Sequence, residues 1–171
     1  MRRAAVLVSA AALVLSTVAI FAQAKPNFTG KWTMVADPTA PAAPAAGGGR
    51  GGRGGGMMGM GASFTIAQDD KTLTVTRQVQ GTDVKSVYNL DGSDSKNTMN
   101  MGGNAMEQVS KAKWDGNKLV VTTSINFNGT AVELGTTYSL DATGNLVVES
   151  TRPDFQGGGA PTKTTATYKK G

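Results

Sequence analysis

Residues 114–140 read WDGNKLVVTTSINFNGTAVELGTTYSL, and the fold prediction rests on this stretch. Apolar and polar side chains alternate on either side of Asn128-Gly129 with a period of two, which is the side-chain period of a β-strand. Asn-Gly favours a tight hairpin turn, because both residues tolerate the positive φ of a type I′ turn. The stretch therefore predicts a β-hairpin whose inward face carries Leu119, Val121, Thr123, Ile125 and Phe127, then Val132, Leu134, Thr136, Tyr138 and Leu140.

Short alternating runs of the same kind fill most of the remaining chain. Turn residues such as Asp91-Gly92 and Asp115-Gly116 separate them. No window beyond the N-terminal segment has the 3.6-residue period of a helix. We predict an all-β fold, an antiparallel up-and-down β-barrel of about 8–10 strands, with a two-sheet sandwich as the alternative. Besides the hairpin, the predicted strands are residues 27–35, 63–68, 72–80, 84–90, 96–101, 106–114, 145–152 and 162–169.

The N-terminal segment has the order of a secretory signal peptide. Met1-Arg2-Arg3 precedes an apolar run over residues 4–21, and Ala22-Gln23-Ala24 then supplies a small-x-small cleavage site. This order predicts a signal peptide over residues 1–24 and a single mature domain over residues 25–171, located in the periplasm or secreted. An uncleaved membrane anchor is the alternative interpretation of the apolar run.

The composition removes several classes of function. The chain has no cysteine and no histidine, which excludes disulfides, thiol catalysis, a Ser-His-Asp triad and most zinc sites. Most acidic residues fall in turns, where aspartate is favoured for local backbone bonding. Without Arg2 and Arg3 of the N-terminal segment, the net charge of +5 falls to +3. This mild positive charge predicts at most weak contact with an anionic membrane surface and gives no reason to expect nucleic acid. We expect no enzyme activity and no cofactor, and the sequence leaves the oligomeric state open.

Residues 37–61 interrupt the alternation. DPTAPAAPAA is rich in proline and alanine, and GGGRGGRGGGMMGMG is rich in glycine. Such segments bury too little apolar surface to offset their ordering entropy, so we predict a low-complexity, flexible insertion between the first two strands. Its Met57, Met58 and Met60 carry soft thioether donors that suit Cu(I), so a Cu(I)-binding envelope protein is one alternative function.

Two arginines occupy positions that the alternation assigns to the inward face. Arg77 and Arg152 each follow, at period two, the apolar residues of their strands, and neither strand supplies an acid in phase. A buried guanidinium is costly unless it is paired. A ligand carboxylate or phosphate inside the barrel would pair with it through bidentate hydrogen bonds. Alternatively, Arg152 extends to solvent or stacks on Trp32, or a β-bulge turns Arg77 outward.

Gly30-x-Trp32, near the start of this β-rich chain, resembles the opening Gly-x-Trp of the lipocalins. The surrounding NFTGKW, followed by hairpins with Asp-Gly turns, is similar to small exported lipocalin-like proteins of bacteria. The resemblance implies a calycin-type barrel in which Trp32 packs the closed end and an arginine late in the chain lies across it. The Thr-Asp-Tyr motif and the disulfide pair of typical lipocalins are missing. In strand pattern the chain also resembles fatty-acid-binding barrels, which hold an acid head group with internal arginines and a tyrosine.

The predicted function is the binding of a small hydrophobic or amphiphilic molecule, anionic if the arginines face it, in a cavity of the barrel. Many small side chains on the inward faces indicate room for such a molecule. The predicted ligand-binding residues are Arg77, Arg152, Tyr88, Tyr138 and Trp32. Besides the Cu(I)-binding protein, a barrel with a filled core that acts in envelope structure or protein contact is an alternative.

Overall fold

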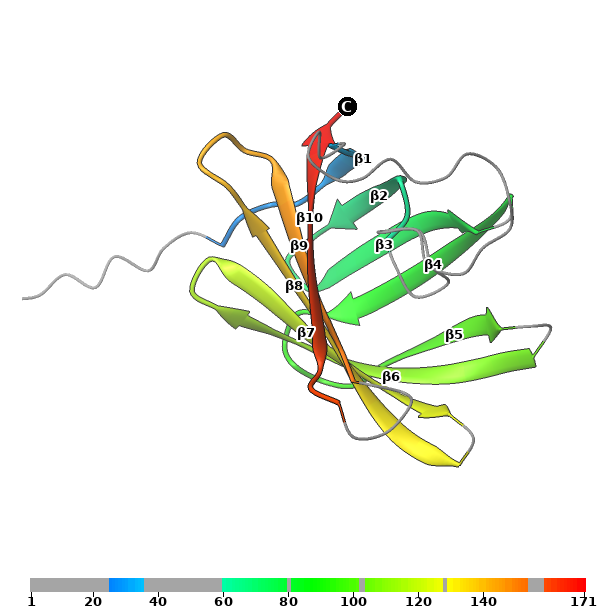
Figure 1. The fold of residues 1–171 in the computed structure, drawn as a ribbon. Helices are drawn as coiled ribbons and strands as arrows, with labels where there is room; N and C mark the ends of the chain where they lie inside the picture. Colours follow the sequence, from blue (N-terminus) through cyan, green and yellow to red (C-terminus); the bar gives the residue numbers. More distant parts are fainter. Residues whose placement is uncertain (1–24, 36–59, 80, 102–103, 128, 154–158) are drawn as a thin grey trace, which may run out of the picture.

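A computed structural model of the chain describes residues 25–35, 60–79, 81–101, 104–127, 129–153 and 159–171 (Figure 1). Within these ranges the regular elements are all β-strands, and none of the described segments is a helix that could cross a membrane. The strands are β1 (Gly30–Met34), β2 (Ser63–Gln68), β3 (Thr72–Val79), β4 (Thr82–Asn89), β5 (Ser95–Met101), β6 (Asn104–Asp115), β7 (Lys118–Phe127), β8 (Thr130–Leu140), β9 (Leu146–Arg152) and β10 (Thr162–Lys170).

The ten strands form one antiparallel sheet that curls into a nearly closed barrel (Figure 1). Except for β4 and β5, neighbours along the chain are neighbours in the sheet. Because β10 returns to pair with β1, the sheet order is β4-β3-β2-β1-β10-β9-β8-β7-β6-β5. This arrangement leaves one seam, between β4 and β5. The predicted all-β, up-and-down barrel is confirmed, and the sandwich alternative is wrong because the strands belong to a single sheet.

The hairpin predicted from residues 114–140 is β7–β8. Phe127 pairs with Thr130, which leaves the two-residue connection that the Asn-Gly pattern indicates. Gly129 has a φ of 82°, and its N–H donates to Asn126 Oδ1 at 2.9 Å, while Asn128 lies outside the described residues. The predicted inward face is confirmed by side chains that are almost fully buried: Leu119, Val121, Ile125 and Tyr138.

Side chains bridge the seam where backbone pairing is missing. The Asn97 carboxamide accepts a hydrogen bond from Val87 N–H at 2.7 Å and donates one to Val87 C=O at 2.9 Å. Ser95 Oγ accepts from the Asn89 N–H at 2.7 Å, and Asn89 Nδ2 donates to the Asp94 carbonyl at 3.0 Å. The Asn97 side chain thus offers β4 the same donor and acceptor that a peptide group of a paired strand would offer.

The two ends of the barrel differ in their connections. At the end that we call the closed end, tight turns begin at Asp69, Asp91, Asp115 and Asp141. At the opposite end, which we call the loop end, β1–β2, β3–β4, β5–β6, β7–β8 and β9–β10 are connected. The predicted insertion belongs to the loop end. Its residues 37–59 lie outside the described residues, whereas Met60 and Gly61 are described and contact the barrel.

Aromatic side chains fill the closed end. Trp32 is 1% exposed and its Nε1–H donates to the Phe28 carbonyl at 2.8 Å, while the Phe28 ring stacks on Trp114 with 5.9 Å between centroids. Lys170 Nζ lies 5.9 Å from the centroid of the Trp32 ring. The structure therefore places a late lysine against Trp32, where the lipocalin resemblance implied a late arginine. Arg152 instead lies in the wall of an interior cavity.

Candidate ligand-binding site

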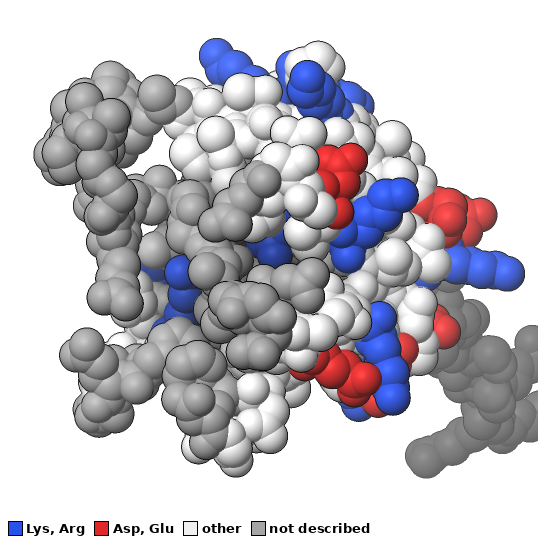
Figure 2. Space-filling view, turned by 90° about the vertical axis from the view of Figure 1, so that its right-hand side faces the viewer, with Lys and Arg blue, Asp and Glu red and all other residues white. Residues whose placement is uncertain are grey.

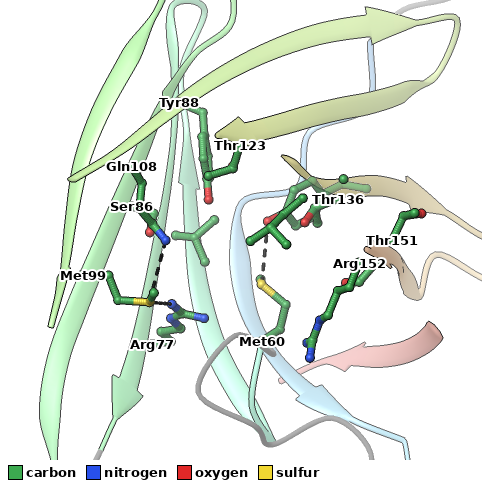
Figure 3. Close-up of a pocket in the computed structure, with 15 residues that line it drawn as sticks. Met60, Arg77, Ser86, Tyr88, Met99, Gln108, Thr123, Thr136, Thr151 and Arg152 are labelled. Carbon is green, nitrogen blue, oxygen red and sulfur yellow. Dashed lines mark hydrogen bonds between the residues drawn. The ribbon is translucent and has the colours of Figure 1, made fainter. Parts of the chain in front are cut away.

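An interior cavity of about 60 Å³ lies on the loop-end side of the core (Figure 3). Side chains from β3 to β9 line it, together with Met60 from the segment that precedes β2. Of the predicted site residues, four line this cavity: Arg77, Arg152, Tyr88 and Tyr138. Trp32 does not line it and belongs to the closed end.

Regular strand pairing places both arginines in the cavity wall. Arg77 pairs with Phe64 of β2 and Val84 of β4, and the β3–β4 register runs without interruption from Thr72 to Val79. The bulge that would have turned Arg77 outward is therefore absent from this ladder. Arg152 ends a continuous β9–β10 ladder opposite Thr162.

The guanidinium of Arg77 lies beside two residues that were not among the predicted ligand-binding residues. Among its contacts, Nη2 donates to Met99 Sδ at 3.8 Å, and Gln108 Nε2 donates to the same sulfur at 3.8 Å. Met99 is 5% exposed. A thioether is a weak acceptor. Two N–H donors from different strands therefore converge on one poor acceptor (Figure 3).

The two cavity tyrosines are held in their neutral form. Burial raises the pKa of Tyr138 well above its ordinary value of 10, and the charge of Arg77 opposes this shift. Burial also raises the pKa of Tyr88, against the opposing effects of a hydrogen bond with Ser86 and the charge of Arg77. Both phenols therefore keep a proton to donate at neutral pH, and both sense the Arg77 charge.

Arg152 reaches the cavity from the wall opposite Arg77. Figure 3 shows the two guanidinium groups extending from opposite sides, with Met60 between them. None of the described residues that line the cavity is an aspartate or a glutamate. The wall therefore combines two fixed positive charges with neutral hydroxyl and amide donors, an arrangement that favours an anion.

Met60 occupies part of the interior. Its Sδ accepts a hydrogen bond from the Tyr138 hydroxyl at 3.7 Å, and the next residue, Gly61, accepts one at its carbonyl from the Tyr168 hydroxyl at 3.2 Å. Burial raises the pKa of Tyr168 to about 12. Met57 and Met58, the other members of the predicted copper-binding cluster, lie outside the described residues.

The described surface around the barrel carries mixed charge. On the face shown in Figure 2, acidic and basic side chains are interspersed over the described residues. One exposed ion pair joins Lys111 Nζ to Asp94 Oδ1 at 3.3 Å. The described part of this face therefore offers no continuous basic stripe of the kind that binds nucleic acid.

No protein-family model matches the chain, and no curated protein matches its sequence.

Proposed function

We propose that the protein is an exported, non-enzymatic, lipocalin-like binding protein whose barrel cavity holds a small amphiphilic molecule through an anionic head group. One observation carries the proposal: Arg77, Arg152 and the hydroxyls of Tyr88 and Tyr138 meet at one cavity with no acidic side chain among its described lining residues. A carboxylate or phosphate accepts charge-assisted hydrogen bonds from guanidinium groups. Neutral tyrosines add donors without adding charge.

The size of the cavity limits what enters without rearrangement. About 60 Å³ is room for a few water molecules, well below the roughly 300 Å³ at which small-molecule pockets begin. A head group fits in this space, but an apolar tail needs more. The side chain of Met60 fills the neighbouring volume, and methionine adopts new rotamers easily because it is unbranched and has several rotatable bonds. In the proposal the tail takes the place of Met60.

The cellular setting follows from the sequence of the first 24 residues. A signal peptide directs the domain to the periplasm or the exterior. The partner is a small molecule, and the modest positive charge adds at most weak contact with a membrane surface.

Calorimetric titration tests the proposal with a matched pair of probes, sodium octanoate and 1-octanol. We expect octanoate to bind more tightly, and Arg77→Ala and Arg152→Ala each to weaken octanoate binding by about 1.5–3 kcal/mol, the range for a hydrogen bond to a charged group. Binding of 1-octanol should change little. Lys85→Ala is the control, because Lys85 is an exposed cation on β4, the strand beside Arg77. Unchanged octanoate affinity in both arginine variants would contradict the proposal.

A further inference from the structure

Met99 Sδ marks a position in the cavity wall toward which two strong donors point. Arg77 Nη2 reaches it from β3, and Gln108 Nε2 reaches it from β6, both at 3.8 Å (Figure 3). Charge-assisted bonds to an anionic oxygen are shorter, about 2.7–2.9 Å, and roughly twice as strong as neutral ones. The thioether sulfur at this position is therefore a weaker hydrogen-bond acceptor for the two donors than an anionic oxygen would be.

The strand register explains why these side chains meet. Gln108 of β6 pairs with Asn97 of β5, and Met99 lies two residues further along β5, on the same face. Arg77 comes from β3, on the other side of the β4–β5 seam. The two donors thus belong to parts of the sheet that no backbone ladder joins across the seam, and the Asn97 carboxamide holds these parts together at Val87.

We propose that Gln108 is a ligand-binding residue and that Arg77 Nη2 and Gln108 Nε2 form an oxyanion subsite, occupied in this structure by the Met99 thioether. The inference rests on the proposed function and makes it more specific. One head-group oxygen replaces the sulfur and accepts from both donors, while Met99 turns away. The subsite carries a single positive charge and one neutral amide, which matches a carboxylate better than a doubly charged phosphate.

The charge balance of the cavity supports this assignment. Gln108 adds a hydrogen-bond donor for the anionic oxygen without adding positive charge to the cavity. Its hydrogen bond is stronger to a carboxylate oxygen than to a hydroxyl oxygen, because a bond to a charged acceptor is roughly twice as strong as a neutral one. Gln108 should therefore distinguish octanoate from 1-octanol through its hydrogen bond alone.

Four variants test the subsite by calorimetric titration with octanoate, octyl phosphate and 1-octanol. We expect Gln108→Leu to weaken octanoate binding roughly tenfold, the effect of one hydrogen bond to a charged group, and to leave 1-octanol binding unchanged. Gln108→Glu places a carboxylate beside Arg77 and should weaken both anions more strongly. Met99→Leu removes the competing sulfur, so octanoate should bind several-fold more tightly. Gln78→Leu, an exposed β3 residue next to Arg77, is the matched control and should bind octanoate like the unmodified protein.

The outcomes separate this inference from the function on which it rests. If Arg77→Ala weakens octanoate binding but Gln108→Leu does not, the subsite is wrong and the anion-binding cavity stands. If the unmodified protein shows no preference for octanoate over 1-octanol, the proposed function itself fails. Weaker octanoate binding in both Gln108→Leu and Met99→Leu would indicate loss of wall packing and would overturn the subsite. Far-UV circular dichroism and the melting temperature of each variant confirm that it is folded.

Discussion

Gly30 leaves room for the side chain that covers Trp32. Its φ is 153°, and a Cβ built on it would lie 2.6 Å from Lys170 Cε, closer than real contacts allow. Lys170 crosses this position to place its ammonium group over the Trp32 ring. The glycine of the Gly-x-Trp motif therefore serves a specific contact between β1 and the end of β10.

Gly30→Ala should destabilise the barrel by about 1–3 kcal/mol, because alanine at positive φ is strained and its Cβ displaces Lys170. Chemical denaturation measures the change. In a Lys170→Ala background the steric part disappears, so Gly30→Ala should cost less there than in the unmodified chain. A neutral Gly30→Ala, or equal costs in the two backgrounds, would show that the close approach is unimportant.

At the scale of single residues, the sequence indicated which side chains face inward but not which of them meet. The phase of Arg77 and Arg152 on their strands was readable because alternation is a local property. The contact between Lys170 and Trp32 was not readable from the sequence. It depends on the pairing of β1 with β10, which are far apart in the sequence but adjacent in the sheet. Gln108 was not predicted as a site residue because residues 106–114 alternate poorly; pairing β6 with the better-defined β7 would have put Gln108 in register with buried Ile125. The contact of Met99 with Arg77 was not predictable because it joins β5 to β3 across the seam.

Among the strands, the seam between β4 and β5 is the structural weak point of the sheet. Asn97 supplies both a donor and an acceptor to Val87, and the bonds of Asn89 to Ser95 and Asp94 hold the adjoining part of the seam. Strand prediction identified residues 84–90 and 96–101 as separate strands. The prediction did not indicate that these two consecutive strands remain unpaired. The alternation of apolar and polar residues shows which side of the sheet a side chain faces, but not which strands pair with each other.

Asn97→Ala should lower the free energy of unfolding by about 1–2 kcal/mol, since it removes two hydrogen bonds at a partly exposed site. Hydrogen exchange of the Val87 amide should accelerate, because its N–H loses its acceptor. Thr98→Ala, on the exposed face of the same strand, is the control. Unchanged exchange at Val87 would argue that the Asn97 carboxamide does not hold the seam.

The segment just before β2 provides a second prediction at this scale. Met60 packs against the core and its sulfur accepts from Tyr138, so Met60→Ala should enlarge the cavity. We expect Met60→Ala to bind octanoate at least as tightly as the unmodified protein does, and to gain the most affinity for longer-chain carboxylates, because their tails no longer displace a side chain. Titration with carboxylates of increasing length measures this. A uniform loss of affinity at every length would show that Met60 is a wall of the site and not an occupant of it.

At the scale of the whole molecule, we expect the aspartates in the turns of the closed end to contribute to the pH dependence of stability in acid. Hydrogen bonds, the largest from the Thr143 hydroxyl, lower the pKa of Asp141 from 3.8 to about 2, and hydrogen bonds also lower the pKa values of Asp69 and Asp91. The unfolded chain therefore takes up protons before the folded one as the pH falls. The stability that the Asp141 carboxylate contributes is present above pH 3.8 and is lost as the pH falls to about 2.

Denaturation at a series of pH values from 5 to 2, compared with the Asp141→Asn variant, checks this expectation. The unmodified protein should lose stability across the window, and the variant should lose less, because one of the shifted carboxylates is gone. Parallel curves for the two proteins would contradict the assignment of the lowered pKa to Asp141.

The barrel as a whole was predictable because hairpin turns and alternating strands are local signals that agree along the chain. The closure of the sheet by β10 on β1, the position of the seam and the small volume of the cavity are long-range results of packing. This packing explains why four of the five predicted site residues line one cavity while Trp32 does not. The sequence therefore predicted four of the residues that line the cavity, but not the size of the cavity.

A crystal structure of the protein soaked with 8-bromooctanoate is the most direct test of the anion-binding cavity. The anomalous signal of bromine locates the tail, and the electron density locates the carboxylate. We expect the carboxylate to lie between Arg77 and Arg152, within hydrogen-bonding distance of Arg77, with the tail in the volume that Met60 now fills. Bromine found only outside the barrel, with the arginines unchanged, would contradict it.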